Sequence, residues 1–377
     1  MSSKAENYTM RVFYLLAIVF VVDGHMSMGH MFEMNGLFRY YSFHLMMFAF
    51  GSGYFFKLYG KPLSDLLHRA KKLMIPLYFW NLVYGVGAAL LRRLGGFELG
   101  EPLSAYTLLF APLADGEHFV WNLGSWFIFP FFCAQVFYAL VRRLSSLWHE
   151  NEWMTFLLCL IPGCVAVQLC YTGRQDILPI WMLRPMILLP GFAGGTLYRR
   201  VLERRDHLPT VPYLIGVVIL RALLCTRYEN LAYLLSDCSY FVCDAFGVYA
   251  GAALAIAFYL RISRLLAPYI GKSRLALAIS RNTFDVMMHH YMGFFALNCF
   301  FLIVHILGLG AADFSVHIFR TRSNYLYAPD GRAEWSVLYL LCGVTLPLLI
   351  GHTARAVKTR LQACLSRRRK PESGSAR

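Results

Sequence analysis

The residue best suited to chemistry is His25, at the end of the apolar run RVFYLLAIVFVVDGH that begins at Arg11. An imidazole titrates near neutral pH, so it can take a proton from a hydroxyl group and return it. Ionisable groups within apolar runs of this length usually face an interior cavity. His25 is therefore a candidate general base, but the spacing alone favours a packed histidine bonded to a neighbouring carbonyl. Asp23 lies about 200° around the helix from His25, so it does not share that face.

A second candidate is a pair of cations, Arg69 and Lys72, which lie three residues apart at the start of another apolar run. On a helix they project to one side, and two cations on one face can hold phosphate groups. The alternative is the general excess of basic residues on the cytoplasmic side of membrane proteins.

Further polar side chains interrupt the apolar runs, and such groups are expensive in a bilayer unless they face a cavity. Ser52 stands between Gly51 and Gly53, where we expect close helix packing through small residues rather than a nucleophile. The others are Asp23, His44, Asn81, Gln135, Arg184, Asp244, Asp285, His289, His290 and Asn298.

The composition predicts an all-α integral membrane protein, because 58% of the 377 residues are hydrophobic and only 15% are charged. We predict about ten transmembrane helices, each near the 20 or so residues that cross a bilayer. The net charge of +15 fits basic loops between spans, not a nucleic-acid-binding face. The expected spans are 10–30, 41–58, 73–91, 121–141, 153–171, 179–198, 211–225, 240–260, 282–309 and 335–352.

The distribution of basic residues predicts the orientation. With these spans, 26 Lys and Arg fall on the side that holds both termini and 8 fall on the other. The basic side is cytoplasmic, which places both termini inside and requires an even number of spans. We therefore expect a transmembrane domain over residues 1–352, followed by a basic cytoplasmic tail over residues 353–377.

Four ordered segments resemble the acyltransferase family 3 membrane proteins, which include sugar O-acetylases. The first is the run that ends at His25. The second is FHLMMFAFGSGYFF at 43–56, which is similar to the fucose 4-O-acetylase-like branch. The third is RAKKLMIPLYFW at 69–80. The fourth is a later pair, GSWFIFPFFCAQVFY at 124–138 and RNTFDVMMHH at 281–290.

The resemblance implies a ten-helix enzyme that moves an acyl group, expected to be acetyl, from cytoplasmic acyl-CoA to a hydroxyl of a cell-envelope carbohydrate. It implies His25 as the catalytic residue, and Arg69 and Lys72 as cations that bind the donor. It also implies a multi-pass protein of the bacterial inner membrane, with a carbohydrate or lipid-linked saccharide as partner, no bound cofactor and no metal. The family usually has Arg or Lys where this chain has Tyr14. Arg11, one turn nearer the cytoplasm, is the candidate to replace it, and we expect Arg11 to bind the CoA phosphates together with Arg69 and Lys72.

In this mechanism His25 activates the acceptor hydroxyl, either directly or by way of an acyl-histidine. Tyr14 and Asn81 are candidate donors to the oxyanion, and we expect both to line the cavity together with Asp23, His44 and His290. Two other functions use the same buried polar groups without chemistry: a transporter or flippase of a lipid-linked saccharide, and a structural subunit of an envelope-polymer assembly.

Overall fold

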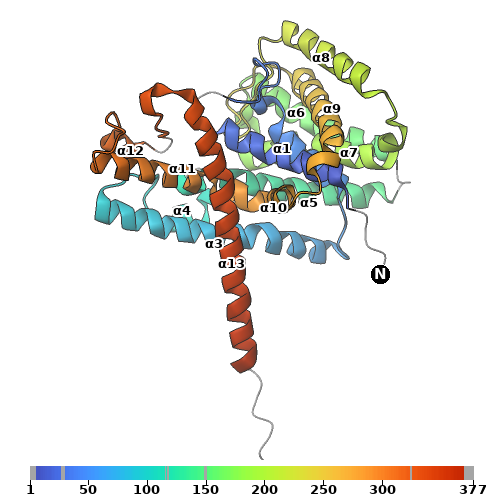
Figure 1. The fold of residues 1–377 in the computed structure, drawn as a ribbon. Coiled ribbons are helices and arrows are strands. Elements are labelled where there is room, and N and C mark those ends of the chain that lie inside the picture. Colours follow the sequence, from blue (N-terminus) through green and yellow to red (C-terminus); the bar gives the residue numbers. More distant parts are fainter. Residues whose placement is uncertain are drawn as a thin grey trace, which may run out of the picture.

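The computed structural model describes residues 6–26, 30–114, 116, 119–147, 151–322 and 325–368, with side chains as far as residue 364. The protein is 76% helical, and no strand occurs in the described ranges. Figure 1 shows long helices packed into one body, with shorter helices at its edges. The chain is thus an all-α membrane protein, as its composition predicts.

The core is built around α1 (Tyr8–Gly24), α2 (His44–Tyr54), α7 (Ile180–Leu197) and α9 (Ala245–Ile270). Helix α2 has only 11 residues, and nearly all of them are buried. A Cβ atom added at Gly53 would lie 1.9 Å from the carbonyl oxygen of Phe192, and one at Gly195 would lie 1.9 Å from that of Phe50. Helices α2 and α7 therefore pack backbone to backbone, which explains the small residues in this apolar run.

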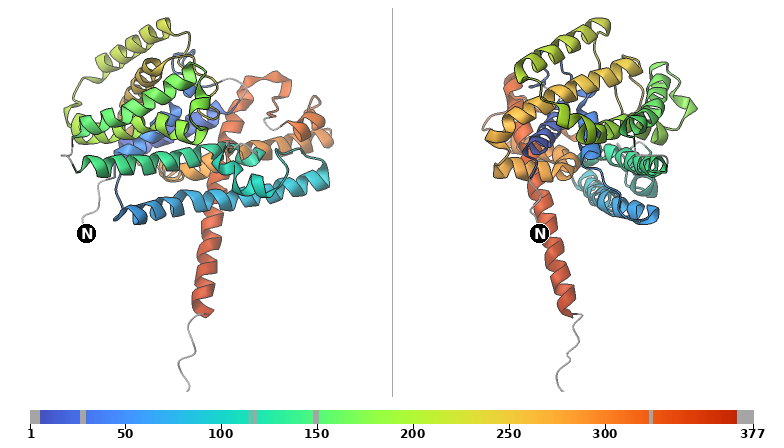
Figure 2. Two further views of the ribbon diagram at one scale, coloured as in Figure 1. Left: turned by 180° about the vertical axis from the view of Figure 1, so that it is seen from behind. Right: turned by 90° about the vertical axis from the view of Figure 1, so that its right-hand side faces the viewer.

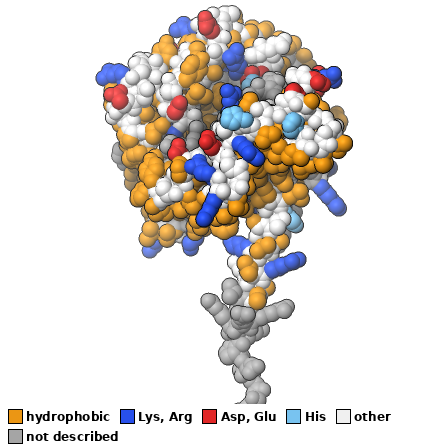
Figure 3. Space-filling view, turned by 90° about the vertical axis from the view of Figure 1, so that its left-hand side faces the viewer, with side chains coloured by type: hydrophobic (Ala, Val, Ile, Leu, Met, Phe, Trp, Pro, Cys, Tyr) orange, Lys and Arg blue, Asp and Glu red, His pale blue; other side chains and the backbone are white. Residues whose placement is uncertain are grey.

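The outer helices present apolar side chains to the bilayer. They are α3 (Pro62–Gly95), α5 (Ile128–Ser145), α6 (Glu152–Tyr171), α8 (Thr210–Arg227), α11 (Thr283–Ile306) and α13 (Ser336–Arg368). On α8, Val211, Ile215, Ile219 and Leu223 recur every four residues and are each more than half exposed. Such a stripe suits lipid rather than water. Figure 3 shows apolar side chains over much of one face, with scattered charges between them.

Eight helices in the described part of the chain are long and apolar enough to cross a membrane. They are α3, α5 with its preceding turn from Val120, α6, α7 with its extension to Arg205, α8, α9, α11, and α13 as far as Cys364 with its preceding turn from Ala333. Each of the ten expected spans falls on a helix, but α1 has 17 residues and α2 has 11. The number ten and the orientation remain predictions.

Ion pairs connect the N-terminal segment with loops that the charge count assigns to the cytoplasmic side. Glu6 lies 2.8 Å from Arg11 and 3.1 Å from Arg281, the last residue of the short helix α10 (Arg274–Arg281). The hydrogen bond from Arg11 lowers the pKa of the Glu6 carboxyl below its usual value. Glu152, before α6, lies 2.7 Å from Arg142 at the end of α5. These segments therefore share one end of the bundle.

Helix α13 packs against α11 in the antiparallel sense, because Gly293 contacts Cys342 and Gly343 while Gly351 contacts Asp285. The helix then continues without a break to Arg368, so no structural boundary occurs at residue 352. Figures 1 and 2 show its last part projecting from the body. Residues 369–377, the rest of the expected tail, lie outside the described residues.

Three short helices complete the chain: α4 (Ala105–Leu109), α10 (Arg274–Arg281) and α12 (Val316–Thr321). Helix α10 precedes α11 and packs against α1. Helix α12 follows α11 and begins with Ser315, whose hydroxyl accepts a hydrogen bond from the amide of Ile318. This cap fixes the start of α12, and the loop that follows α12 contributes to the site described below.

Candidate active site

His25 lies at the C-cap of α1, where its amide donates to the carbonyl oxygens of Val21 and Val22 at 3.2 and 3.3 Å. Its side chain is half-buried. The ring nitrogen Nδ1 lies 2.9 Å from the hydroxyl oxygen of Tyr291, on α11. The end of α1 thus holds the backbone of His25. Helix α11 holds the imidazole through Tyr291, which is 266 residues further along the chain.

A second imidazole lies beside the first. The rings of His25 and His290 stack with centroids 5.0 Å apart and planes inclined by 28°. Nδ1 of His290 lies 3.1 and 2.9 Å from the carbonyl oxygens of Val286 and Met287. Because a carbonyl oxygen only accepts, Nδ1 carries the hydrogen and Nε2 keeps a lone pair. That Nε2 is buried and has no hydrogen-bond partner in the described part of the chain.

The stacked pair is positioned by a close contact with the turn before α5. A Cβ atom added at Gly124 would lie 2.6 Å from Cε1 of His290 and 2.6 Å from the carbonyl oxygen of Met287. Only glycine allows this approach, because any side chain would meet the backbone of α11.

His25 lies in the wall of an interior cavity of about 380 Å³. Its polar lining includes His44, Tyr41, Ser236 and the hydroxyl of Tyr291, while Phe48, Phe127 and Met287 contribute apolar surface. This volume is within the range of small-molecule sites. The remaining described residues of the wall are Val21, Leu45, Leu123, Gly124, Trp126, Tyr233, Leu234 and Leu235.

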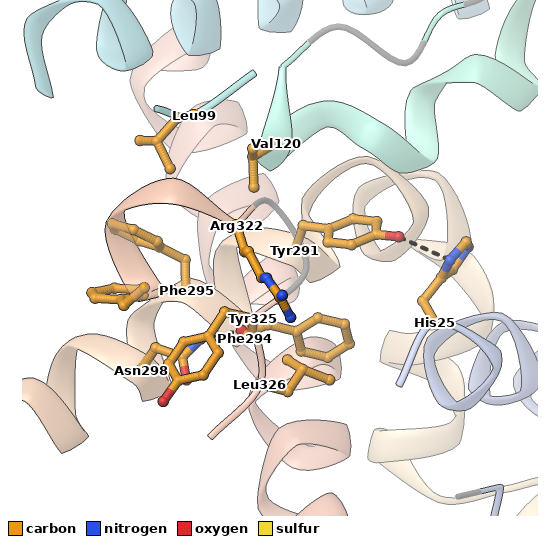
Figure 4. Close-up of a pocket in the computed structure, with 11 residues that line it drawn as sticks. His25, Leu99, Val120, Tyr291, Phe294, Phe295, Asn298, Arg322, Tyr325 and Leu326 are labelled. Atoms are coloured by element: carbon orange, nitrogen blue, oxygen red, sulfur yellow. Dashed lines mark hydrogen bonds between the residues drawn. The ribbon is translucent and has the colours of Figure 1, made fainter. Parts of the chain in front are cut away.

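A smaller cavity, of about 20 Å³, lies on the other side of the His25–Tyr291 pair. Figure 4 shows the pair joined by its hydrogen bond, with Arg322, Asn298 and Tyr325 among the other lining residues. The two cavities share both His25 and Tyr291. The His25–Tyr291 pair therefore forms part of the wall of both cavities.

Of the other cavity candidates, His44 reaches the wall, and its Nδ1 lies 2.5 Å from the carbonyl oxygen of Tyr40. Asp23 faces away from His25, as its helical spacing predicts. Its carboxylate accepts from the hydroxyl of Tyr40 and, at 3.0 Å, from the amide of Met31. His290 stacks against His25 but is not among the described residues that line the large cavity.

The two candidate oxyanion donors lie elsewhere in the bundle. Asn81 donates to the carbonyl oxygens of Thr107 and Leu108 and accepts from Asn122 at 3.1 Å, so it links α3 to the turn before α5. Tyr14 lies over Gly51, where an added Cβ would be 2.7 Å from its ring, and it hydrogen-bonds to Ser52. Neither is among the described lining residues of the two cavities.

The three predicted donor-binding cations have different environments. Arg69 is buried; it lies 3.0 Å from Asp65 and donates to Gln135 at 3.0 Å and to the carbonyl oxygen of Lys57 at 2.8 Å. Arg11 donates to the carbonyl oxygen of Gly271 at 2.6 Å and pairs with Glu6. Lys72 is exposed. Arg69 and Arg11 thus already bind protein oxygens, whereas Lys72 faces outward.

Sequence reasoning missed Tyr291, which directly follows the HH pair of the fourth motif. Only its position beside His290 in the sequence could have suggested it. It also missed Arg322, which lies in a loop rather than in an apolar run, where the cost of burial gives no signal.

The acyltransferase domain model matches residues 12–354, which cover nearly the whole bundle and include His25, Tyr291 and both cavities. This chain belongs to acyltransferase family 3. No curated protein and no solved structure matched it. The protein is therefore a multi-pass membrane acyltransferase.

Proposed function

We propose that this acyltransferase moves an acetyl group from cytoplasmic acetyl-CoA to a hydroxyl of a cell-envelope carbohydrate, with His25 as the general base. The observation that carries the proposal is the position of His25, half-buried in the wall of an interior cavity and hydrogen-bonded to Tyr291 at 2.9 Å. A flippase would need a cavity but no imidazole fixed by two helices.

In the proposed reaction, His25 alone carries the proton from the acceptor hydroxyl to the CoA thiolate. The acceptor hydroxyl gives its proton to His25 as its oxygen bonds to the thioester carbonyl carbon. The tetrahedral intermediate then loses the C–S bond, and the CoA thiolate takes the proton back from the imidazolium. For His25 to accept through Nε2, its Nδ1 must carry the hydrogen and donate it to the oxygen of Tyr291. Tyr291 would thus fix the required tautomer.

The proposed transfer requires that little water reach the thioester. The apolar wall residues of the large cavity, among them Phe48, Phe127 and Trp126, limit the water that could attack the thioester. The donor would reach the cavity from the end of the bundle that holds Arg11, Arg69 and Lys72. Tyr14 lies between that end and His25 along α1, 11 residues and about three helical turns before His25.

The setting of the reaction is also a proposal. The second motif favours the fucose 4-O-acetylase-like branch, and hence a sugar or lipid-linked saccharide as acceptor. The enzyme would work in the bacterial inner membrane, using CoA from inside and a glycan from the outer side. It would need no metal or bound cofactor, since imidazole catalysis suffices for this step.

The test is acyl transfer by protein purified into nanodiscs, supplied with isotopically labelled acetyl-CoA and a panel of glycans. Mass spectrometry would detect both the acetylated glycan and free CoA. We expect His25→Gln, which keeps a similar size, to lose activity by at least about 100-fold while remaining folded. His305→Gln, at the far end of α11, is the matched control. Wild-type turnover by the His25 variant would disprove the assignment.

A further inference from the structure

The small cavity beside the His25–Tyr291 pair contains a cation with no counter-charge. Arg322 is among its lining residues, and its side chain makes no hydrogen bond or ion pair within the described ranges. No carboxylate is among the described residues that line this cavity. Figure 4 shows the guanidinium extending toward the middle of the lining residues.

The buried arginines of the protein behave differently, because each binds oxygen atoms of the protein. Arg221 donates to the carbonyl oxygen of Leu37 at 2.9 Å and to the hydroxyl of Ser42 at 2.6 Å. Arg261 pairs with Asp206 and donates to the carbonyl oxygen of Leu208 at 2.8 Å. Arg322, by contrast, is exposed, and the five N–H donors of its guanidinium have no protein acceptor in the described chain.

The loop that carries Arg322 is held on both sides. Its amide donates at 2.8 Å to the carbonyl oxygen of Ile318 and so ends α12. Further along, Asn298 donates at 2.6 Å to the carbonyl oxygen of Tyr325 and accepts from the amide of Tyr327 at 3.3 Å. The backbone of Arg322 is thus held at the end of α12, while its side chain is exposed.

The surroundings favour an anion over a neutral group. Phe294, Phe295 and Leu326 line the same cavity as Arg322, and charge–charge attraction beside such apolar surface is stronger than in bulk water. A guanidinium offers paired donors that match a carboxylate or phosphate. A volume of about 20 Å³ holds little more than a water-sized group, so the anion would bind at the mouth, near Arg322.

We propose that Arg322 forms an anion subsite, and that the acceptor is therefore an acidic saccharide. Its hydroxyl would lie at His25, which also lines the larger cavity of about 380 Å³ where a sugar ring fits, and its carboxylate or phosphate would lie at Arg322, at the mouth of the small cavity. This inference rests on the proposed function for the role of the anion, but the binding of the anion itself does not depend on acyl transfer.

The binding test uses phenylglyoxal, which modifies arginine, on the protein in phosphatidylcholine nanodiscs that add no anionic lipid. Peptide mass spectrometry follows Arg322 and, as the internal reference, Arg332, which lies in the same loop with an exposed side chain. The probes are glucose, glucuronate and glucose 1-phosphate at about 0.1 M, far above a millimolar dissociation constant. Glucuronate reports a carboxylate, and glucose 1-phosphate reports a phosphate.

We expect one or both anionic sugars to slow modification of Arg322 by at least about fivefold, with Arg332 unaffected and glucose without effect. Protection by glucose equal to that by the anions would overturn the proposal, as would no protection by either anion. Because no transfer is measured, this result stands even if the acyltransferase mechanism proposed above fails.

The kinetic test compares variants on matched acidic and neutral glycans. Arg322→Gln should raise KM for the acidic acceptor by about 10-fold or more, with KM for acetyl-CoA unchanged, and Arg322→Lys should recover part of the loss. Arg332→Gln is the control and should leave both constants unchanged. Equal KM values for the wild type and Arg322→Gln on every acidic acceptor would exclude the subsite, whereas an absence of transfer by the wild type would count against the proposed function alone.

Discussion

The hydroxyl of Tyr291 and the Nδ1 atom of His25 lie 2.9 Å apart, although 266 residues separate them in the chain. The contact joins the end of α1 to the first half of α11 and lies between the two cavities. In the proposed mechanism, this contact determines which nitrogen of the imidazole faces substrate.

Replacing Tyr291 with Phe should lower kcat by about 10- to 100-fold, because the imidazole keeps its place but loses the partner that fixes its tautomer. KM for acetyl-CoA and the melting temperature should stay near the wild-type values. Tyr228→Phe is the matched control, since it removes a hydroxyl bonded to Asp244 at 2.8 Å, and Tyr228 is not among the described residues that line either cavity. Unchanged kcat in Tyr291→Phe would remove the tyrosine from the mechanism.

Helical periodicity and motif order predict much of this protein, but they do not predict contacts between distant segments. The apolar runs give the helices, and the spacing of Asp23 and His25 places them on different faces. The pairing of His25 with Tyr291 depends on how α1 and α11 pack, which no local pattern encodes. The burial of Arg69 could have been suspected, because Asp65 precedes it by four residues, a favourable ion-pair spacing on a helix.

Gly124→Ala should impair both activity and folding. The new methyl group would lie 2.6 Å from Cε1 of His290 and from the carbonyl oxygen of Met287, and the backbone of α11 cannot turn aside as a side chain would. We expect a loss of about 1–3 kcal/mol in stability, measured as thermal unfolding in detergent, and reduced turnover. Gly216→Ala, where no atom lies within 4 Å of the added carbon, should be neutral or slightly stabilising. Equal behaviour of the two variants would contradict this packing.

The donor-binding cations should separate into two classes. Lys72→Ala should raise KM for acetyl-CoA several-fold without a change in melting temperature, because Lys72 is exposed. Arg69→Ala should instead lower the melting temperature, since Asp65, Gln135 and the carbonyl oxygen of Lys57 would lose their partner. Thermal unfolding and donor titration on the same preparations make the comparison. A stable Arg69→Ala protein with only a raised donor KM would show that Arg69 binds CoA directly.

Arg221 is a buried charge within the expected span 211–225, and its removal should be costly. Its guanidinium binds Leu37, Ser42 and Gly251 through their oxygen atoms, and so it ties α8 and α9 to the segment that precedes His44. Arg221→Met would leave those buried acceptors without a donor, at a cost of about 1–3 kcal/mol for each group that finds no other partner. We expect a clear fall in melting temperature and in turnover, because His44 and Tyr41 line the large cavity.

Arg227→Met is the control for that change, as it lies on the same helix with its side chain exposed and should unfold like the wild type. Glycan acetylation measured at a temperature where both variants remain folded then separates the cavity wall from overall stability. If Arg221→Met retained both its melting temperature and its activity, the link from α8 to the wall of the site would have no energetic role. The lipid-facing stripe of α8 would then have to hold this helix in place by itself.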